Sequence, residues 1–226
     1  MTGEDHRITT LITGAKGVGV SAFEFFFSFY GLLLGLSVAE LVGGFSRVLH
    51  ERQRVRFGWL TPLLALFVAV DLVTFWNQAW VFFRGAPFSP ILLLLGLMIA
   101  STFYVAASVT FPRVNAEGVE ARIDLDEHFW KHRGVVFGCI LAANAMVWLL
   151  LGGMALYAAA WAAVWTPRLI IGVAIFAIGT SVAAFAKNRR VVIGALVILL
   201  GYMMWNMGRA AFILMDSGGW SPAIGG

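Results

Sequence analysis

Charge is scarce in this chain of 226 residues. Asp, Glu, Lys and Arg together make up 12% of the sequence, whereas hydrophobic residues make up 60% and the mean hydropathy is +0.86. A soluble globular domain carries about twice that charged fraction. The composition therefore excludes an ordinary soluble domain and indicates that most of the chain lies in lipid.

Cysteine and histidine are also rare, with one and four residues respectively. The lone Cys139 excludes a disulfide within the chain. The sequence contains no G-x-S-x-G, P-loop, H-E-x-x-H or dinucleotide-binding motif. No loop is long enough to hold a separate catalytic site. We therefore expect a protein that is not an enzyme and that carries no cofactor.

Six long apolar runs dominate what the chain does contain. A transmembrane helix needs about 20 mostly apolar residues, and each run reaches that length. The sequence predicts an all-α polytopic membrane helix bundle over residues 22–215, with tails at 1–21 and 216–226. The expected spans are 24–46, 59–83, 89–112, 134–157, 168–186 and 191–214.

Basic residues favour alternate loops. The first, third and fifth loops hold most of the 16 Lys and Arg residues, and short basic loops stay in the cytoplasm. We therefore expect a multi-pass protein of the cell (inner) membrane with both termini outside. The basic loops are expected to meet anionic headgroups of the lipid bilayer, and nucleic acid is not an expected partner.

The third loop contains a second kind of pattern. In RIDLDEHFWKHR (122–133), apolar residues gather on one side at helical spacing and charged residues on the other. This pattern predicts a short amphipathic helix at about 120–133, lying at the cytoplasmic interface. Asp124, His128 and His132 line one edge of it at i, i+4 and i+8. That edge offers three metal ligands or is simply its hydrated face, and since no fourth ligand is evident we assign no metal.

Asp71 is the sharpest candidate for a functional group. It lies near the middle of the second span, where an Asp costs about 2.5–3.5 kcal/mol to insert, so it should face protein or water. Thr74 and Gln78 follow on the same helical stripe, and Asn77 lies nearby. The sixth span carries a similar stripe. Its members are Tyr202, Asn206 and Arg209.

We therefore hypothesise that spans two and six face each other across a polar cavity that opens outward, with Asp71 near its base. A structural interpretation also stands: Asp71 hydrogen-bonds Asn206, Tyr202 or Arg209 and holds two helices together, at about 0.6–2 kcal/mol per contact. Asn144 in span four is expected to extend the polar lining.

Glu40 is a second acid within a span. It either extends toward Arg47 at the cytoplasmic surface or faces Asp71 and forms a two-carboxylate path for a proton or small cation. The same span carries small residues at every fourth position, namely Gly31, Gly35, Ala39 and Gly43. These predict a helix-packing interface, with a helix of this chain or of another.

The stretches FYGLLLGLSVAEL (29–41) and FPRV…DLDEHFWKHR (111–133) resemble uncharacterised bacterial multi-pass integral membrane proteins. The resemblance implies a bacterial inner-membrane setting and brings no activity with it.

Three functions remain open from the residues. The first is transport of a small cation or proton through a channel or transporter that uses the intramembrane acids, with Asp71 as principal site. The second is a non-catalytic membrane subunit or scaffold, which binds a larger membrane complex or forms a homo-oligomer through its first helix. The third is an enzyme acting on a lipid-borne substrate. Reconstituted flux that depends on Asp71 separates the first from the second.

Overall fold

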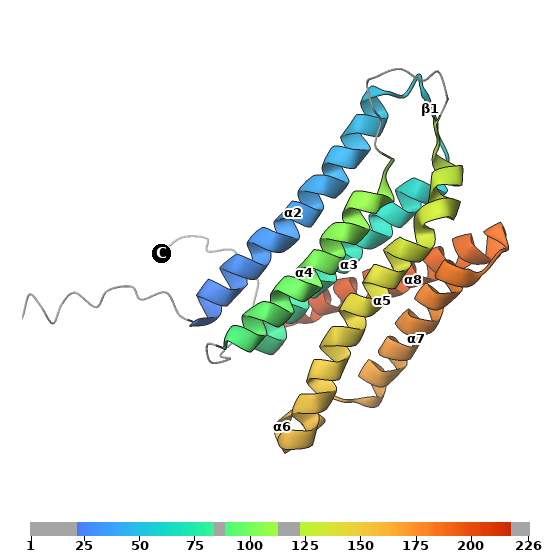
Figure 1. The fold of residues 1–226 in the computed structure, drawn as a ribbon. Coiled ribbons are helices and arrows are strands. Elements are labelled where there is room, and N and C mark those ends of the chain that lie inside the picture. Colours follow the sequence, from blue (N-terminus) through green and yellow to red (C-terminus); the bar gives the residue numbers. More distant parts are fainter. Residues whose placement is uncertain (1–21, 84–88, 113–122, 218–226) are drawn as a thin grey trace, which may run out of the picture.

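The computed structural model describes residues 22–83, 89–112 and 123–217. Six of its helices are long and apolar enough to cross a membrane, which confirms the all-α class and the six spans. Figure 1 shows α2, α3, α4, α5 and α7 side by side, α8 crossing behind them, and one short helix, α6, between α5 and α7. The helices are α2 (Ala22–His50), α3 (Leu60–Phe83), α4 (Pro90–Thr110), α5 (Leu125–Tyr157), α6 (Ala159–Ala162), α7 (Pro167–Phe185) and α8 (Arg189–Asp216).

Local signals explain where several helices begin. Pro90 and Pro167 occupy the first turns of α4 and α7, where the missing N–H has no intrahelical partner to lose. The Thr166 hydroxyl accepts a hydrogen bond from the Leu169 N–H and caps α7. Asp124 and Asn188 cap α5 and α8 in the same way.

The amphipathic segment is not a separate helix, which corrects the sequence prediction. α5 runs without a break from Leu125 to Tyr157, through Gly134. Leu125 and Phe129 are buried and continue the apolar face that Val136 and Phe137 extend deeper into the bundle, so packing holds the helix straight through the glycine. Residues 120–122 lie outside the described residues.

The three basic loops meet at one end of the bundle, which we call the basic end. Two short strands, β1 (Val55–Arg56) and β2 (Ile123–Asp124), pair in parallel and join the first loop to the third. An ion pair of 2.6 Å between Arg189 and Asp126 brings the fifth loop to the same place. The alternation of loops that the charges predicted is therefore present in the fold, whereas the two strands were not predicted. Arg113 and Arg122 lie outside the described residues.

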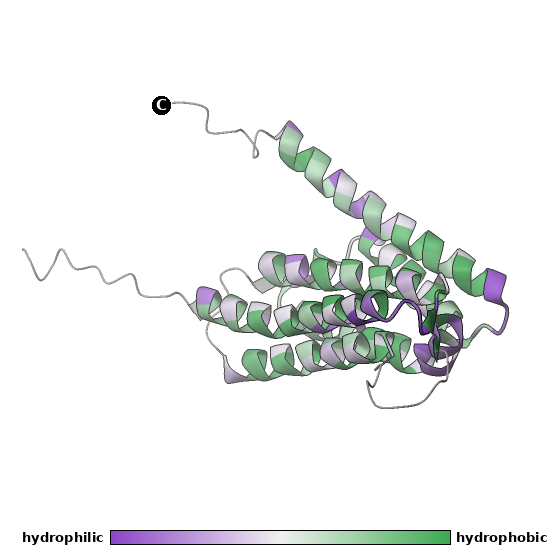
Figure 2. Cartoon of the chain, turned by 90° about the horizontal axis from the view of Figure 1, so that it is seen from above, coloured by the Kyte–Doolittle hydropathy of each residue, from purple (hydrophilic) through white to green (hydrophobic). Residues whose placement is uncertain are grey.

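The core lies between the helices, receives buried side chains from α2, α3, α4, α5, α7 and α8, and contains several aromatic contacts. Phe75 of α3 meets Phe103 of α4 edge to face, with ring centroids 4.5 Å apart. Phe67 contacts Phe137 of α5 and Phe176 of α7. Figure 2 shows that apolar residues predominate along these helices, and many of the large ones are exposed, as expected for a chain surrounded by lipid.

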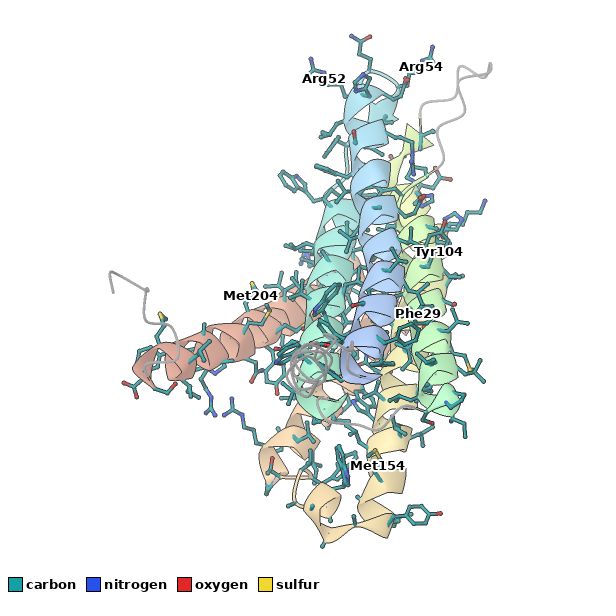
Figure 3. All side chains as sticks on the ribbon, turned by 90° about the vertical axis from the view of Figure 1, so that its left-hand side faces the viewer. Phe29, Arg52, Arg54, Tyr104, Met154 and Met204 are labelled. Atoms are coloured by element: carbon teal, nitrogen blue, oxygen red, sulfur yellow. The ribbon has the colours of Figure 1, made fainter. Side chains whose placement is uncertain are left out.

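α8 departs from the common direction of the other helices (Figure 2). Its buried residues end at Met203, and the half of the helix beyond is largely exposed. Figure 3 shows the part that carries Met204 projecting away from the bundle. The inner half of α8 thus belongs to the core, while its outer half stands apart.

Candidate functional site

Asp71 is buried in the middle of α3, with 1% of its surface exposed. Asn144 of α5 lies beside its carboxyl group, and the Asn144 amide donates a hydrogen bond to the Ile140 carbonyl at 3.0 Å. The Oδ2 atom of Asp71 is buried without a hydrogen-bond partner. A buried acceptor of this kind carries a desolvation cost that a bound donor or proton would relieve.

A cavity of about 630 Å³ adjoins this carboxyl group and is called the Asp71 cavity here. It lies between α3, α5, α7 and α8 and extends from Asp71 toward the end of the bundle opposite the basic end. The polar residues that line it are Asp71, Thr74, Asn77, Gln78, Asn144, Thr166, Arg168, Tyr202 and Asn206.

The structure brings together most of the polar residues on the two predicted stripes. Thr74, Asn77 and Gln78 line the α3 side of the cavity, and Tyr202 and Asn206 line the α8 side. Tyr202 lies close to Gly172, where the missing side chain leaves room for the phenol, and this contact joins α8 to α7. The arrangement matches the hypothesis of two spans that face each other across a polar space, while the role of these residues stays a prediction.

Arg209 does not join the site. It is exposed on the outer half of α8 and does not line the cavity, so the proposed contact with Asp71 is absent from this structure. The lining face of α8 continues past this position, because Met203, Asn206, Met207 and Ala210 all border the cavity, so Arg209 is left out by the face on which it lies. The spacing of Tyr202, Asn206 and Arg209 puts them on one side of the helix, but the lining is centred on the neighbouring face, with Tyr202 near its edge and Arg209 beyond it.

Glu40 also lies away from the cavity. Its Oε1 atom accepts a hydrogen bond from Arg47 at 3.0 Å, near the end of α2. Of the two interpretations of Glu40, the structure therefore supports the extension toward the basic end. A path formed by Glu40 and Asp71 together is not present.

The Gly strip of α2 makes one close contact within the chain. Gly31 is buried against Trp76 of α3, so that a side chain at position 31 would meet the indole ring at 2.6 Å. Gly35 has no neighbour within 4 Å, and Ala39 is exposed. Within the chain, α2 packs instead through a different face, which includes Leu34 and Leu41. The prediction of one continuous packing interface along Gly31, Gly35, Ala39 and Gly43 is therefore wrong for contacts inside the described bundle.

The histidine edge of α5 has structural contacts. Asp124 caps α5 and pairs with Arg56 at 3.7 Å, His128 hydrogen-bonds the Val109 carbonyl at 3.0 Å, and His132 bonds the His128 carbonyl. Among the residues that the structure describes, no three His, Cys, Asp or Glu side chains form a group suited to a metal ion. These contacts tie α5 to α4 and to the first loop.

Arg168 was not among the site residues predicted from the sequence. It lies in the first turn of α7, lines the cavity, and donates a hydrogen bond of 3.1 Å to Asn206 of α8. Trp148 of α5 also lines the cavity and meets Phe176 edge to face. Thr166–Pro167 is typical of a helix start, and this pattern could have indicated that residue 168 lies in the first turn of a helix and not in a loop.

The inner end of the cavity is closed by large apolar side chains. Phe67 and Val68 on α3, Phe137 and Ile140 on α5, and Leu199 on α8 are all buried to within 1% of their surface. They lie on the basic-end side of Asp71 in each helix. The cavity is therefore open on one side of Asp71 and sealed on the other.

The class that fold and site define is a polytopic α-helical membrane protein with a buried acid at the base of a cavity. Comparison with protein-family models, curated proteins and solved structures finds no match to this chain.

Proposed function

We propose that this protein moves a proton or small cation across the membrane and that Asp71 is the group that binds it. The observation that carries the proposal is the unpartnered Oδ2 atom of Asp71 at the closed end of the Asp71 cavity. Ionisable groups within membrane spans are costly and commonly mark pathways for protons and ions. A structural acid would be expected to have both oxygens satisfied by neighbouring helices.

The arrangement supports a transporter more than an open channel. Thr74 and Gln78 give the cavity a polar wall above Asp71, whereas Phe67 and Phe137 close the chain's interior below it. A continuous pore would need a polar or hydrated path on both sides of the acid. In the proposed cycle, Asp71 takes up its cation from the outer cavity, and repacking of the helices then opens the basic end.

The proposed function is tested by flux into proteoliposomes. The purified chain is reconstituted, a pH gradient or a Na⁺ or K⁺ gradient is imposed, and the internal ion is followed with a fluorescent indicator. We expect flux in the native protein and its loss in Asp71→Asn, which keeps the size of the side chain and removes its charge. Asp216→Asn, at the exposed end of α8, is the matched control and should retain flux. Equal flux in Asp71→Asn and the native protein would contradict the proposal.

A membrane subunit is the second candidate, and the outer half of α8 favours it. Trp205 and Phe212 are 70% and 65% exposed there, and Arg209 lies between them on a helix that leaves the bundle. A cationic side chain on an isolated helix in lipid is costly, and a neighbouring protein would lower that cost. Photocrosslinking from position 205, with no flux in the assay above, would favour this function over transport.

A further inference from the structure

The Asp71 cavity carries opposite charges at its two ends. Asp71 lies at the inner end, and Arg168 lies at the outer end, in the first turn of α7. Along α7 the lining runs from Arg168 to Phe176, a distance of about 12 Å at 1.5 Å per residue. Asp71 and Arg168 are the charged residues of the described lining. The net formal charge of the lining is therefore zero, with the negative group at one end and the positive group at the other.

Each charged group has hydrogen-bonding capacity to spare. The Oδ2 atom of Asp71 lacks a partner and suits an ammonium group, which is a donor only. Arg168 donates one N–H to Asn206, and the guanidinium has four more. Asn206 is itself fixed, because its amide donates to the Tyr202 carbonyl at 2.8 Å and so turns its oxygen toward Arg168. A guanidinium held in this way can bind a carboxylate or phosphate through two parallel bonds.

The cavity wall between the two charged groups suits the apolar carbon skeleton of an organic molecule. Trp148, Val173, Phe176 and Met203 provide apolar and aromatic surface along the cavity. A volume of about 630 Å³ is in the range of small-molecule sites, which are about 300–1,000 Å³, and far exceeds a bare ion. A proton or metal cation on Asp71 would leave the aromatic wall and Arg168 without a role.

We propose that the cavity binds a bipolar organic solute, whose ammonium group pairs with Asp71 and whose carboxylate or phosphate pairs with Arg168. This inference rests on the proposed function, because it names the cargo of the same cavity. The proton or small cation then competes with the ammonium group for the Asp71 carboxylate. Because the Asp71 carboxylate pairs with one of them at a time, the solute binds when the competing cation leaves.

The test is equilibrium binding to the full chain in phosphatidylcholine nanodiscs, measured by titration calorimetry with empty nanodiscs as background. The probes are 6-aminohexanoate, which carries both charges, and its single-charge analogues hexylamine and hexanoate. We expect 6-aminohexanoate to bind about tenfold or more tightly than either analogue, because it alone makes both charge-assisted contacts. Glycine, whose charges are too close to reach both ends, should bind more weakly than 6-aminohexanoate.

Two variants assign the contacts. Arg168→Gln should reduce 6-aminohexanoate affinity to that of hexylamine and leave hexylamine binding unchanged. Asp71→Asn should reduce it to that of hexanoate and leave hexanoate binding unchanged. Arg209→Gln, on the same side of the bundle but outside the lining, is the matched control for Arg168→Gln and should bind as the native protein does. A circular dichroism melt of each variant verifies that it is folded.

A cavity that binds hexylamine and 6-aminohexanoate equally, with no effect of Arg168→Gln, would overturn the inference. If 6-aminohexanoate fails to bind while Asp71-dependent ion flux persists, the bipolar cargo is wrong and the proposed function stands. If 6-aminohexanoate binds through both residues without any flux, the inference stands and transport is wrong.

A lipid headgroup can supply the same chemistry as a free solute, since phosphatidylethanolamine carries both an ammonium group and a phosphate. The cavity lining includes Val73 and Met207, which are exposed on the outer surfaces of α3 and α8. Nanodiscs with phosphatidylethanolamine identify this source. Weaker 6-aminohexanoate binding there, restored in the phosphatidylcholine discs, indicates a lipid-derived ligand. Equal binding in the two indicates a water-borne one.

Discussion

At the basic end, the Asp126 carboxylate accepts a hydrogen bond from the Leu60 N–H at 3.2 Å and pairs with Arg189 at 2.6 Å. On the other side of the bundle, the Asp71 carboxylate has an oxygen without any partner and borders a cavity. Both acids are on helices; Asp71 is fully buried and Asp126 is partly buried. Asp126 joins α5 to α3 and α8, whereas Asp71 retains an oxygen that can still accept a hydrogen bond.

Other polar side chains at the basic end and around the cavity differ in the same way as these two acids. Arg133 donates to the carbonyls of Ala183 and Ala186 and so satisfies the end of α7, while Thr61 donates to the Leu125 carbonyl. Around the cavity, by contrast, the outer half of α8 diverges from α3 and leaves their polar side chains facing open space. The polar side chains of the basic end are therefore used in contacts between elements, whereas several of those around the cavity face its open space.

The largest effect that would test this division is expected for Asp126→Ala. The change leaves the Leu60 N–H and the Arg189 guanidinium without their partner, and we expect a loss of about 3 kcal/mol in the free energy of unfolding. Unfolding by sodium dodecyl sulfate in mixed micelles measures it. Glu127→Ala, at the next and exposed position, is the control and should change stability by less than about 0.5 kcal/mol. Equal losses in the two variants would mean that the basic end is not held by Asp126.

A smaller loss is expected for Arg133→Gln. This side chain makes two hydrogen bonds to the last turn of α7 and lies over the Trp130 ring at 4.1 Å. We expect about 1–2 kcal/mol of destabilisation, because Gln retains at most one of the two bonds. The same unfolding assay applies, with Lys131→Gln, at an exposed neighbouring position, as control. Hydrogen exchange should also quicken at the C-terminal end of α7 and not elsewhere.

Asp71→Asn should alter stability by less than about 1 kcal/mol in either direction. The carboxyl group has one unsatisfied oxygen, so an amide of the same size loses little and avoids burying an unpaired charge. This result would separate Asp71 from Asp126, because Asp71 would be dispensable for folding and required for flux. A loss as large as that of Asp126→Ala would instead show that Asp71 is structural.

Arg209→Leu is expected to have the smallest effect on the isolated chain, about 0–0.5 kcal/mol. Arg209 is exposed and takes part in no ion pair among those seen in the described residues. The measurement is the same unfolding titration on the monomeric chain. Strong destabilisation by this change would indicate that α8 closes over the cavity and that Arg209 reaches Asp71 after all.

The six spans and their alternating loops could be predicted because lipid imposes simple rules of length and charge. The site was partly predictable because a charged residue within a span must face protein or water. This rule singled out Asp71, and helical spacing placed Thr74 and Gln78 on the same side of the helix. Helical spacing then gave the face of α8 that carries Tyr202 and Asn206.

The remaining features depend on how helices cross. The polar residues of α8 do not show which side of the helix faces the cavity, so the absence of Arg209 from the lining could not be foreseen. Gly31 meets Trp76, but small residues indicate only that some helix approaches closely and not which one. Asp126 joins Leu60 and Arg189, which are more than 60 residues away in the chain, and no local pattern connects them.

The central claim is that water enters from the outer side as far as Asp71 and no farther. Single cysteines in a Cys139→Ala background test it directly, with a membrane-impermeant thiol reagent applied to spheroplasts or to inverted vesicles. Thr74→Cys lines the cavity, Val70→Cys lies one turn deeper and is buried, and Arg52→Cys marks the basic end. We expect Thr74→Cys to react from the side opposite to Arg52→Cys, and Val70→Cys to react from neither. Reaction of Thr74→Cys from the same side as Arg52→Cys, or from neither side, would contradict the account.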